Sequence, residues 1–544
     1  MHTLSQAATP RAGRRQWLAG CFRFALLSLV CWGTLDRAFP LASRYLDTTG
    51  GRLHAQQAAG PATANSGASA TDQVARETWD ALFLRGAKVG YARTRITPID
   101  ENGRPLLAIS VEQHLALKRF GQPSDQEMKL DSVETPQGEV LRFVTSTKLG
   151  AAPIVARGKL DGDKMIVETN TAGKVKTNQL PWSSDIGGVI AVEQSLSHKP
   201  MQPGEKRAVK SVLPMLDQTL IVTTDLHARQ LEPTLLLNGT YYLLRIESSV
   251  QLAGGLKLDS VLWANRVGEV LKTSATAMGL ETYRTTRVQA LNEPTDQHFD
   301  LGYDSVVRVA RAIDPAAEQV RYRVRLREGD PMAVFVSGWT QRVRPVDEHT
   351  ADVTVRGVPV DAIAAASAAE GWGADPAPTA ADRQPNSLLQ SDDPAVTALA
   401  AEAAGDERDP VRLACRLEEF VHDRITTKNF SQALATAAEV AKSLEGDCTE
   451  HAVLLAALAR ARGIPARVAI GLVYMPGQQG FGYHMWNELY VGEHWVPFDA
   501  TLGRSGIGAT HLKLAHSNLK ETNALTCFLP VAQVLGQLEI EVLD

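Results

Sequence analysis

The sequence predicts a multidomain protein in which antiparallel β-rich N-terminal modules precede an α+β domain. Its 544 residues exceed the roughly 250–300 that one hydrophobic core supports, so we expect more than one domain. Short alternating apolar runs between turn residues fill much of residues 77–361, a pattern typical of strands. From residue 406 onward, apolar residues first recur at helical spacing and then alternate. Helices followed by strands indicate an α+β domain.

The composition is that of a globular protein without a disulfide scaffold. Hydrophobic residues make up 44% and charged residues 22% of the chain, which excludes wholesale disorder. A net charge of −5 gives no reason to expect nucleic acid or an anionic membrane surface as a partner. Five cysteines are too few for a disulfide scaffold, and their odd number leaves at least one thiol outside any disulfide.

The N-terminal residues 1–38 resemble a signal peptide or a membrane anchor. Arginines precede Phe24–Leu35, an apolar run of 12 residues, which is shorter than the roughly 20 that a spanning helix needs. Extending the run back across Arg23 would instead give an uncleaved anchor, so both interpretations stay open. Either one predicts an extracytoplasmic protein: periplasmic, secreted or membrane-anchored. Residues 39–76, rich in Ala, Gly, Ser and Thr, are expected to form a flexible linker.

A short sequence motif occurs twice in the β-rich region at 77–295, and we call this repeat the sequence echo. Lys129–Val133 reads Lys-Leu-Asp-Ser-Val, and Lys257–Val261 repeats it 128 residues later. Each copy leads through a turn to Gly-Glu-Val-Leu, and the second turn is expected to be two residues longer. We infer two similar antiparallel modules packed as one long curved sheet, with chance recurrence of a hairpin pattern as the alternative.

The remaining chain divides by composition. Residues 296–361 are expected to add a further β segment, and the Ala/Asp/Pro-rich residues 362–405 a linker. The C-terminal domain is then residues 406–544. Within it we expect a helix from Cys448 to Arg462, since Gly463 follows as a stop signal, and then strands at 467–474, 484–491 and 494–499.

Three residues of this domain form the chain order of a thiol triad. Cys448 begins the predicted helix, His484 lies 36 residues downstream on one strand, and Asp499 lies 15 further on at the end of the next. A helix N-terminus and a neighbouring imidazolium both favour a thiolate, the reactive form of cysteine. Cys448 would be the nucleophile, His484 the base and Asp499 the residue that orients the imidazole. The backbone N–H of Cys448 is a natural oxyanion donor, and Asn429 or Gln432 are candidates for a second.

Other histidines and cysteines have plainer interpretations. His451 lies one turn after Cys448 and is expected to pack or support rather than catalyse. Cys448, His451, His484 and Asp499 are all metal-ligand types but lack a paired-cysteine spacing, so we expect no metal and no cofactor. Cys415 is expected in the core, and His511 and His516 in packing or at the surface. Trp486 and Glu488, on the strand face of His484, are expected to form groove wall and hydrogen-bond support.

These segments resemble the transglutaminase-like superfamily of the bacterial exported type, whose papain-type core carries Cys, His and Asp in this order. The matching segments lie between residues 406 and 515. They are Gly446–Ala452, Gly463–Arg467, His484–Glu488 and Trp495–Asp499.

The resemblance implies thiol acyl transfer on the amide bonds of a protein or peptide substrate. A cysteine peptidase or amidase is the favoured activity. A protein transamidase is the close alternative, because both reactions pass through an acyl-thioester and differ only in the acceptor. A non-catalytic extracytoplasmic binding or assembly protein that keeps the fold is the third interpretation.

Overall fold

The computed structural model describes most of the chain from residue 76 to residue 543. The described ranges are 76–148, 153–171, 173–214, 219–251, 257–275, 279–292, 300–358, 375–430, 434–503, 507–520, 531, 534 and 536–543. The predicted signal or anchor, almost all of the predicted linker at 39–76, Gln432 and Cys527 lie outside these ranges. Within them, no helix is both long and apolar enough to span a bilayer.

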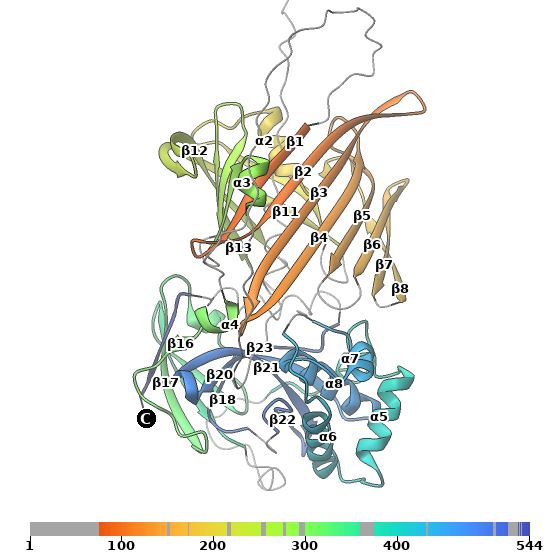
Figure 1. Ribbon diagram of the computed structural model, residues 1–544, viewed down its shortest axis with the longest axis vertical. Coiled ribbons are helices and arrows are strands. Elements are labelled where there is room, and N and C mark those ends of the chain that lie inside the picture. Colours follow the sequence, from red (N-terminus) through yellow and green to blue (C-terminus); the bar gives the residue numbers. More distant parts are fainter. Residues whose placement is uncertain are drawn as a thin grey trace, which may run out of the picture.

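Among the described residues, 15 strands form one curved antiparallel sheet, here called the large sheet (Figure 1). Two meanders meet in it, because β1 pairs with β15, and only the two-residue β9 runs parallel to its neighbour. Its strands are β1 (Arg76–Leu84), β2 (Ala87–Glu101), β3 (Arg104–Arg119), β4 (Gln122–Glu134), β5 (Val140–Lys148), β6 (Ile154–Asp161), β7 (Lys164–Thr171), β8 (Lys174–Pro181), β9 (Ile186–Gly187), β10 (Lys206–Pro214), β11 (Thr219–Leu236), β12 (Gly239–Gln251), β13 (Lys257–Ala264), β14 (Val270–Ala275) and β15 (Leu280–Thr285). Short helices α2 (Ala191–His198), α3 (Arg287–Leu291) and α4 (Leu301–Asp304) accompany it.

The sequence echo occupies equivalent places in the two meanders. In β4–β5 the Thr135 N–H bonds the Glu139 carbonyl at 2.9 Å, and in β13–β14 the Asn265 N–H bonds the Glu269 carbonyl at the same distance. The glycine before each glutamate has positive φ, 96° at Gly138 and 78° at Gly268. The two turns therefore have equal length. The two extra residues of the second copy lie within strand β13, between the repeated Lys-Leu-Asp-Ser-Val and the turn.

The C-terminal half joins helices to two smaller sheets, and the α+β prediction is confirmed. The C-terminal sheet has the order β16-β21-β20-β23, with β22 paired to β21, and a third sheet has the order β18-β19-β17-β24. Their strands are β16 (Val307–Arg308), β17 (Gln319–Leu326), β18 (Gln341–Asp347), β19 (Thr350–Arg356), β20 (Ala466–Met475), β21 (Gly480–Val491), β22 (His494–Phe498), β23 (His511–Ser517) and β24 (Leu538–Val542). The helices are α5 (Pro394–Ala404), α6 (Pro410–Arg424), α7 (Ala437–Ser443) and α8 (Cys448–Ala461), and they gather beside β21 and β22 (Figure 1).

Residues 375–405 correct the linker prediction for 362–405. They contain α5, and their side chains Leu388, Leu389 and Val396 are buried in the main hydrophobic core. The abundant alanines of this segment suggested a flexible connection, but they let α5 pack closely against α8 instead. The described part of the range is thus an integral layer of the C-terminal half.

The predicted helix at 448–462 is confirmed as α8, and it is the central element of this half. Every residue from Cys448 to Arg460 is buried, because α5, α6 and α7 surround the helix and β20 and β21 lie against it. A helix with apolar residues on all sides is stable only in such a position. Gly463, at φ +81°, ends it as expected.

Candidate active site

A capping box fixes the start of α8. The Asp447 side chain accepts the Thr449 N–H at 2.9 Å, and the Glu450 side chain accepts the Asp447 N–H at 2.9 Å. Gly446, at φ +148°, brings the preceding chain so close that a Cβ there would lie 2.4 Å from the Glu450 Cβ. Cys448 therefore occupies the first helical position, where unpaired N–H groups favour a negative charge.

Cys448, His484 and Asp499 come together in the structure, and all three are buried. The His484 Nε2 lies 2.7 Å from the Asp499 Oδ2, which leaves Nδ1 of the ring for Cys448. His484 comes from β21, and Asp499 directly follows β22, the strand that pairs with β21. The predicted hairpin of these two strands thus sets the distance between the imidazole and the carboxylate.

The electrostatics of the three groups favour a charged imidazole. Burial lowers the pKa of His484, but the charges of Asp499 and Cys448 and hydrogen bonds to both raise it to about 10. Burial likewise opposes ionisation of Asp499, yet His484 and His511 hold the pKa of that carboxyl far below its usual range. The arrangement therefore stabilises a proton on His484 between two acids.

Asp499 is anchored on every side. Its Oδ1 accepts the Thr501 N–H at 2.9 Å, and its own N–H donates to the Glu418 Oε1 at 2.7 Å. Burial raises the pKa of Glu418 to about 9, so this acid from α6 is neutral near pH 7 and adds no second negative charge. A fixed carboxylate in turn holds the imidazole in one orientation.

His511 is the residue that the sequence interpretation missed. Its Nε2 lies 3.1 Å from the Asp499 Oδ2, so Asp499 bonds two imidazoles through one oxygen. The expectation of a packing or surface role overlooked the alternation of residues 511–517, in which Leu512 and Leu514 separate polar residues. That alternation places His511 and Lys513 on one strand face, and strand pairing carries this face to His484.

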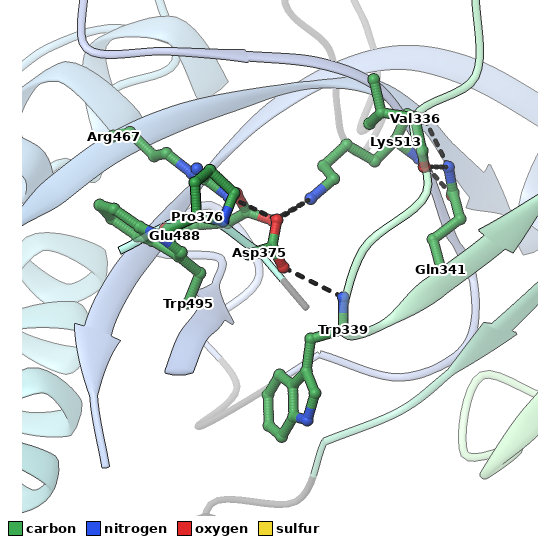
Figure 2. A network of polar contacts seen from close by, with 9 residues as sticks. All are labelled: Val336, Trp339, Gln341, Asp375, Pro376, Arg467, Glu488, Trp495 and Lys513. Carbon is green, nitrogen blue, oxygen red and sulfur yellow. Dashed lines mark hydrogen bonds and ion pairs between the residues drawn. The ribbon is translucent and has the colours of Figure 1, made fainter. Parts of the chain in front are cut away.

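A buried network of charges continues the same face of β21. The Glu488 carboxylate pairs with the Arg467 guanidinium at 2.7 Å and the Lys513 ammonium at 2.6 Å. Asp375 pairs with Arg467 at 3.0 Å and accepts the Trp339 N–H at 3.0 Å (Figure 2). Although burial raises the pKa of Glu488, the two cations lower it to about 2. Trp486 stands between His484 and Glu488 on β21. Its ring stacks on the His484 ring, with the ring centroids 6.2 Å apart.

His451 forms its hydrogen bonds with Asp447 and Lys428, not with Cys448 or His484. Its Nδ1 lies 2.5 Å from the Asp447 carbonyl oxygen, and its Nε2 lies 3.2 Å from the Lys428 Nζ. Burial and the Lys428 charge lower the pKa of His451 to about 3, so the ring is neutral. It accepts a hydrogen bond from the ammonium rather than taking part in proton transfer, which agrees with the expected supporting position.

The set of possible metal ligands in the structure differs from the set considered from the sequence. Within the described ranges, the group of ligand atoms close enough to hold an ion is His484, Asp499 and His511, with the atoms within 4.8 Å of one another. His451, a member of the set considered from sequence, is engaged elsewhere. The three donors would suit Zn²⁺ only if both imidazoles gave up the N–H that each directs at Asp499.

The remaining sequence candidates occupy minor positions. The Asn429 side chain lies half-buried, with Nδ2 3.5 Å from the Glu445 Oε2, so its part as a second oxyanion donor stays a prediction. Cys415 is half-buried and packs against the main core from α6, as the apolar stripe of that helix predicted.

Comparison with known proteins adds a family to this geometry. Residues 397–500 match the family model of the transglutaminase-like superfamily, a range that runs from α5 to just past Asp499. A search of curated proteins found no match.

Solved structures resemble parts of the chain. A provisionally assigned cysteine protease from Cytophaga hutchinsonii is 16% identical, with a TM-score of 0.25 over 42% of this chain and 81% of its own. A β-barrel-like protein from Brucella abortus is 9% identical, with a TM-score of 0.28 over 38% of this chain and 94% of its own. The periplasmic domain of TgpA from Pseudomonas aeruginosa, bound to ethylmercury, is 16% identical, with a TM-score of 0.22 over 36% and 89%.

The family match and the buried Cys448–His484–Asp499 arrangement together support a papain-like thiol enzyme in general terms.

Proposed function

The C-terminal region carries a transglutaminase-like domain, and on that premise we propose that the protein is a cysteine peptidase or amidase. The single observation that supports this most is the His484 imidazole, bonded to Asp499 at 2.7 Å and to Cys448 through its other side. A nucleophile, a base and an orienting group in contact are what acyl transfer requires. The substrate class is a protein or peptide amide.

The reaction divides between the three residues. The Cys448 sulfur attacks the amide carbonyl carbon while the thiol proton resides on His484. The resulting oxyanion accepts a hydrogen bond from the Cys448 backbone N–H. His484 then gives its proton to the leaving amine, the C–N bond breaks and an acyl-thioester remains. Water attacks the thioester, His484 takes a proton from the water, and the acid leaves as the thiol reforms. Asp499 keeps the imidazole in one tautomer throughout.

We place this activity outside the cytoplasm. The charged and apolar N-terminal residues 1–38 and the small-residue stretch that follows support export or anchoring. A thiol nucleophile works in an oxidising compartment when it has no disulfide partner nearby. Neither Cys415 nor Cys448 is in a disulfide within the described ranges.

The test compares the acceptors directly. Purified protein and its Cys448→Ala variant are incubated with denatured casein and a dansylated primary amine. New α-amino termini that depend on Cys448 support the peptidase. Dansyl incorporation without new termini assigns the transamidase instead. If neither product forms and Cys448→Ala restores a deletion strain in full, the protein is a non-catalytic binding or assembly factor.

A further inference from the structure

The tip of the β3–β4 hairpin reaches from the large sheet into the C-terminal half, beside α4 (Figure 1). Phe120 and Gly121 form the turn, both with positive φ, at 49° and 82°. Asp300 accepts both of their N–H groups, at 3.0 and 2.7 Å. The Phe120 ring lies 5.2 Å from the Phe430 ring. These contacts hold the tip in one place.

Arg119, the last residue of β3, uses this position to reach α8. Its side chain is 3% exposed, and its Nη2 donates to the Asp447 Oδ2 at 2.6 Å. Its Nη1 donates to the Phe430 carbonyl at 3.3 Å. Asp447 is fully buried, caps α8 and immediately precedes Cys448. A residue of the large sheet thus pairs with the anion next to the candidate nucleophile.

We propose that Arg119 is a positioning residue for the Cys448 thiol, acting from the large sheet through Asp447; this inference rests on the proposed function of that site. Without the guanidinium, Asp447 is a buried anion beside the sulfur, and it would disfavour a thiolate there. Arg119 cancels that charge while it leaves the other Asp447 oxygen for the helix cap.

The same hairpin tip supports a second cation of the site. Gln122, the first residue of β4, accepts the Phe430 N–H at 3.1 Å and donates to the Lys428 carbonyl at 3.5 Å. The Lys428 ammonium bonds His451, whose other nitrogen bonds the Asp447 carbonyl. Burial lowers the pKa of Lys428, and the charges of Cys448, Asp447 and Asp499 oppose that change.

The charge balance around the thiol involves groups from several elements. The charged or titratable residues facing Cys448 and Asp447 are Arg119 from β3, Lys428 from the segment after α6, Glu450 and His451 from α8, His484 from β21, and Asp499 after β22. Burial and the Asp447 charge raise the pKa of Glu450 well above its usual value, which disfavours a second negative charge beside Asp447. Arg119 is therefore the cation that pairs directly with the Asp447 carboxylate.

The test is the rate at which iodoacetamide alkylates Cys448 between pH 5 and pH 9, followed by mass spectrometry with Cys415 as the internal reference. Arg119→Gln should slow Cys448 about tenfold at pH 6 and move the half-maximal rate up by about one pH unit. Asp447→Asn keeps a good cap and should be no slower than wild type, because the cation remains. The double variant should return to within about threefold of wild type.

The control is Arg142→Gln, which removes the same charge from an exposed pair with Glu101 on the same sheet and should leave the rate unchanged. If Arg119→Gln and Asp447→Asn slow the alkylation of Cys448 equally, Arg119 only stabilises the local structure and the inference is wrong. If Arg119→Gln does not fold, the double variant decides: a rate near wild type supports charge pairing, and a tenfold loss refutes it. Failure of the proposed function looks different, since wild-type Cys448 would then react no faster than Cys415 at pH 6.

Discussion

Glu77 in the large sheet and Glu488 in the C-terminal sheet are carboxylates with the same local chemistry and different surroundings. Glu77 bonds the guanidinium groups of Arg93 and Arg95, at 3.0 and 2.8 Å, and Glu488 bonds Arg467 and Lys513. The pKa of each carboxyl is lowered to about 2. The Glu77 side chain, however, is 28% exposed, whereas that of Glu488 is 2% exposed.

The difference teaches where charge matters in this protein. Water and salt screen the Glu77 pairs, so they contribute little to stability. The Glu488 pairs are shielded from water, and removing one partner leaves buried charges without compensation. His484 shares the strand and the face of Glu488, so the candidate catalytic groups lie in the region where charges act strongly.

The largest effect is expected at the centre of the buried region. Cys448→Ala and His484→Ala should each lower kcat/KM for casein cleavage by about 10⁴-fold or more, because nucleophile and base act as a unit. The double variant should cost little more, and Asp499→Ala should keep more activity than either single change. Circular dichroism checks that each variant folds. A chelator should leave the wild type active; if it abolishes cleavage, the His484–Asp499–His511 group holds a metal.

The next effect compares the two carboxylates directly. Glu488→Gln should lower the free energy of unfolding by about 3–5 kcal/mol, because two buried cations are then left with the single carboxylate of Asp375. Glu77→Gln, the matched exposed control, should change it by only about 0–1 kcal/mol. Both lowered pKa values contribute stability that is present above the unfolded pKa near 4.5 and is lost as the pH falls towards 2. Urea unfolding at pH 7 measures both; equal losses would break the comparison.

A buried acid without a cation should behave in the opposite sense. Glu418 has a raised pKa of about 9, so its own contribution to folding stability is greatest below pH 4.5 and falls as the pH rises towards 9. Glu418→Gln keeps an oxygen for the Asp499 N–H and removes the ionisation, and it should stabilise the protein at pH 8 by about 1–3 kcal/mol. The gain should vanish at pH 4. Glu419→Gln, an exposed neighbour on α6, should show no gain at either pH.

The smallest effect is expected at the second imidazole on Asp499. His511→Ala should lower kcat by about tenfold with little change in KM, because Asp499 and through it His484 become less well oriented. His516→Ala, on the same strand but away from Asp499, serves as the control and should keep full kcat. An unchanged kcat in His511→Ala would show that the Thr501 and Glu418 contacts are enough to orient Asp499.

Local patterns in the sequence were enough for the α+β order, for α8 and for the hairpin that carries His484 and Asp499. Glycines at 446 and 463 mark the helix boundaries, and alternation marks the strands, because these signals depend on backbone conformation over a few residues. The chemistry proposed for Cys448, His484 and Asp499 followed from residue type and order. The packed α5 segment was missed because an alanine-rich stretch carries little local information about what it packs against.

What the sequence by itself determined is therefore the nature and order of the candidate catalytic groups. Tertiary structure alone decided their surroundings: His511 on Asp499, the neutral Glu418 beneath it, and Arg119 paired with Asp447 across 328 residues of chain. The physical reason is that burial and charge pairing depend on which distant elements meet. No spacing rule within one segment encodes a contact between a hairpin tip and a helix cap, because that contact exists only once both halves have packed together.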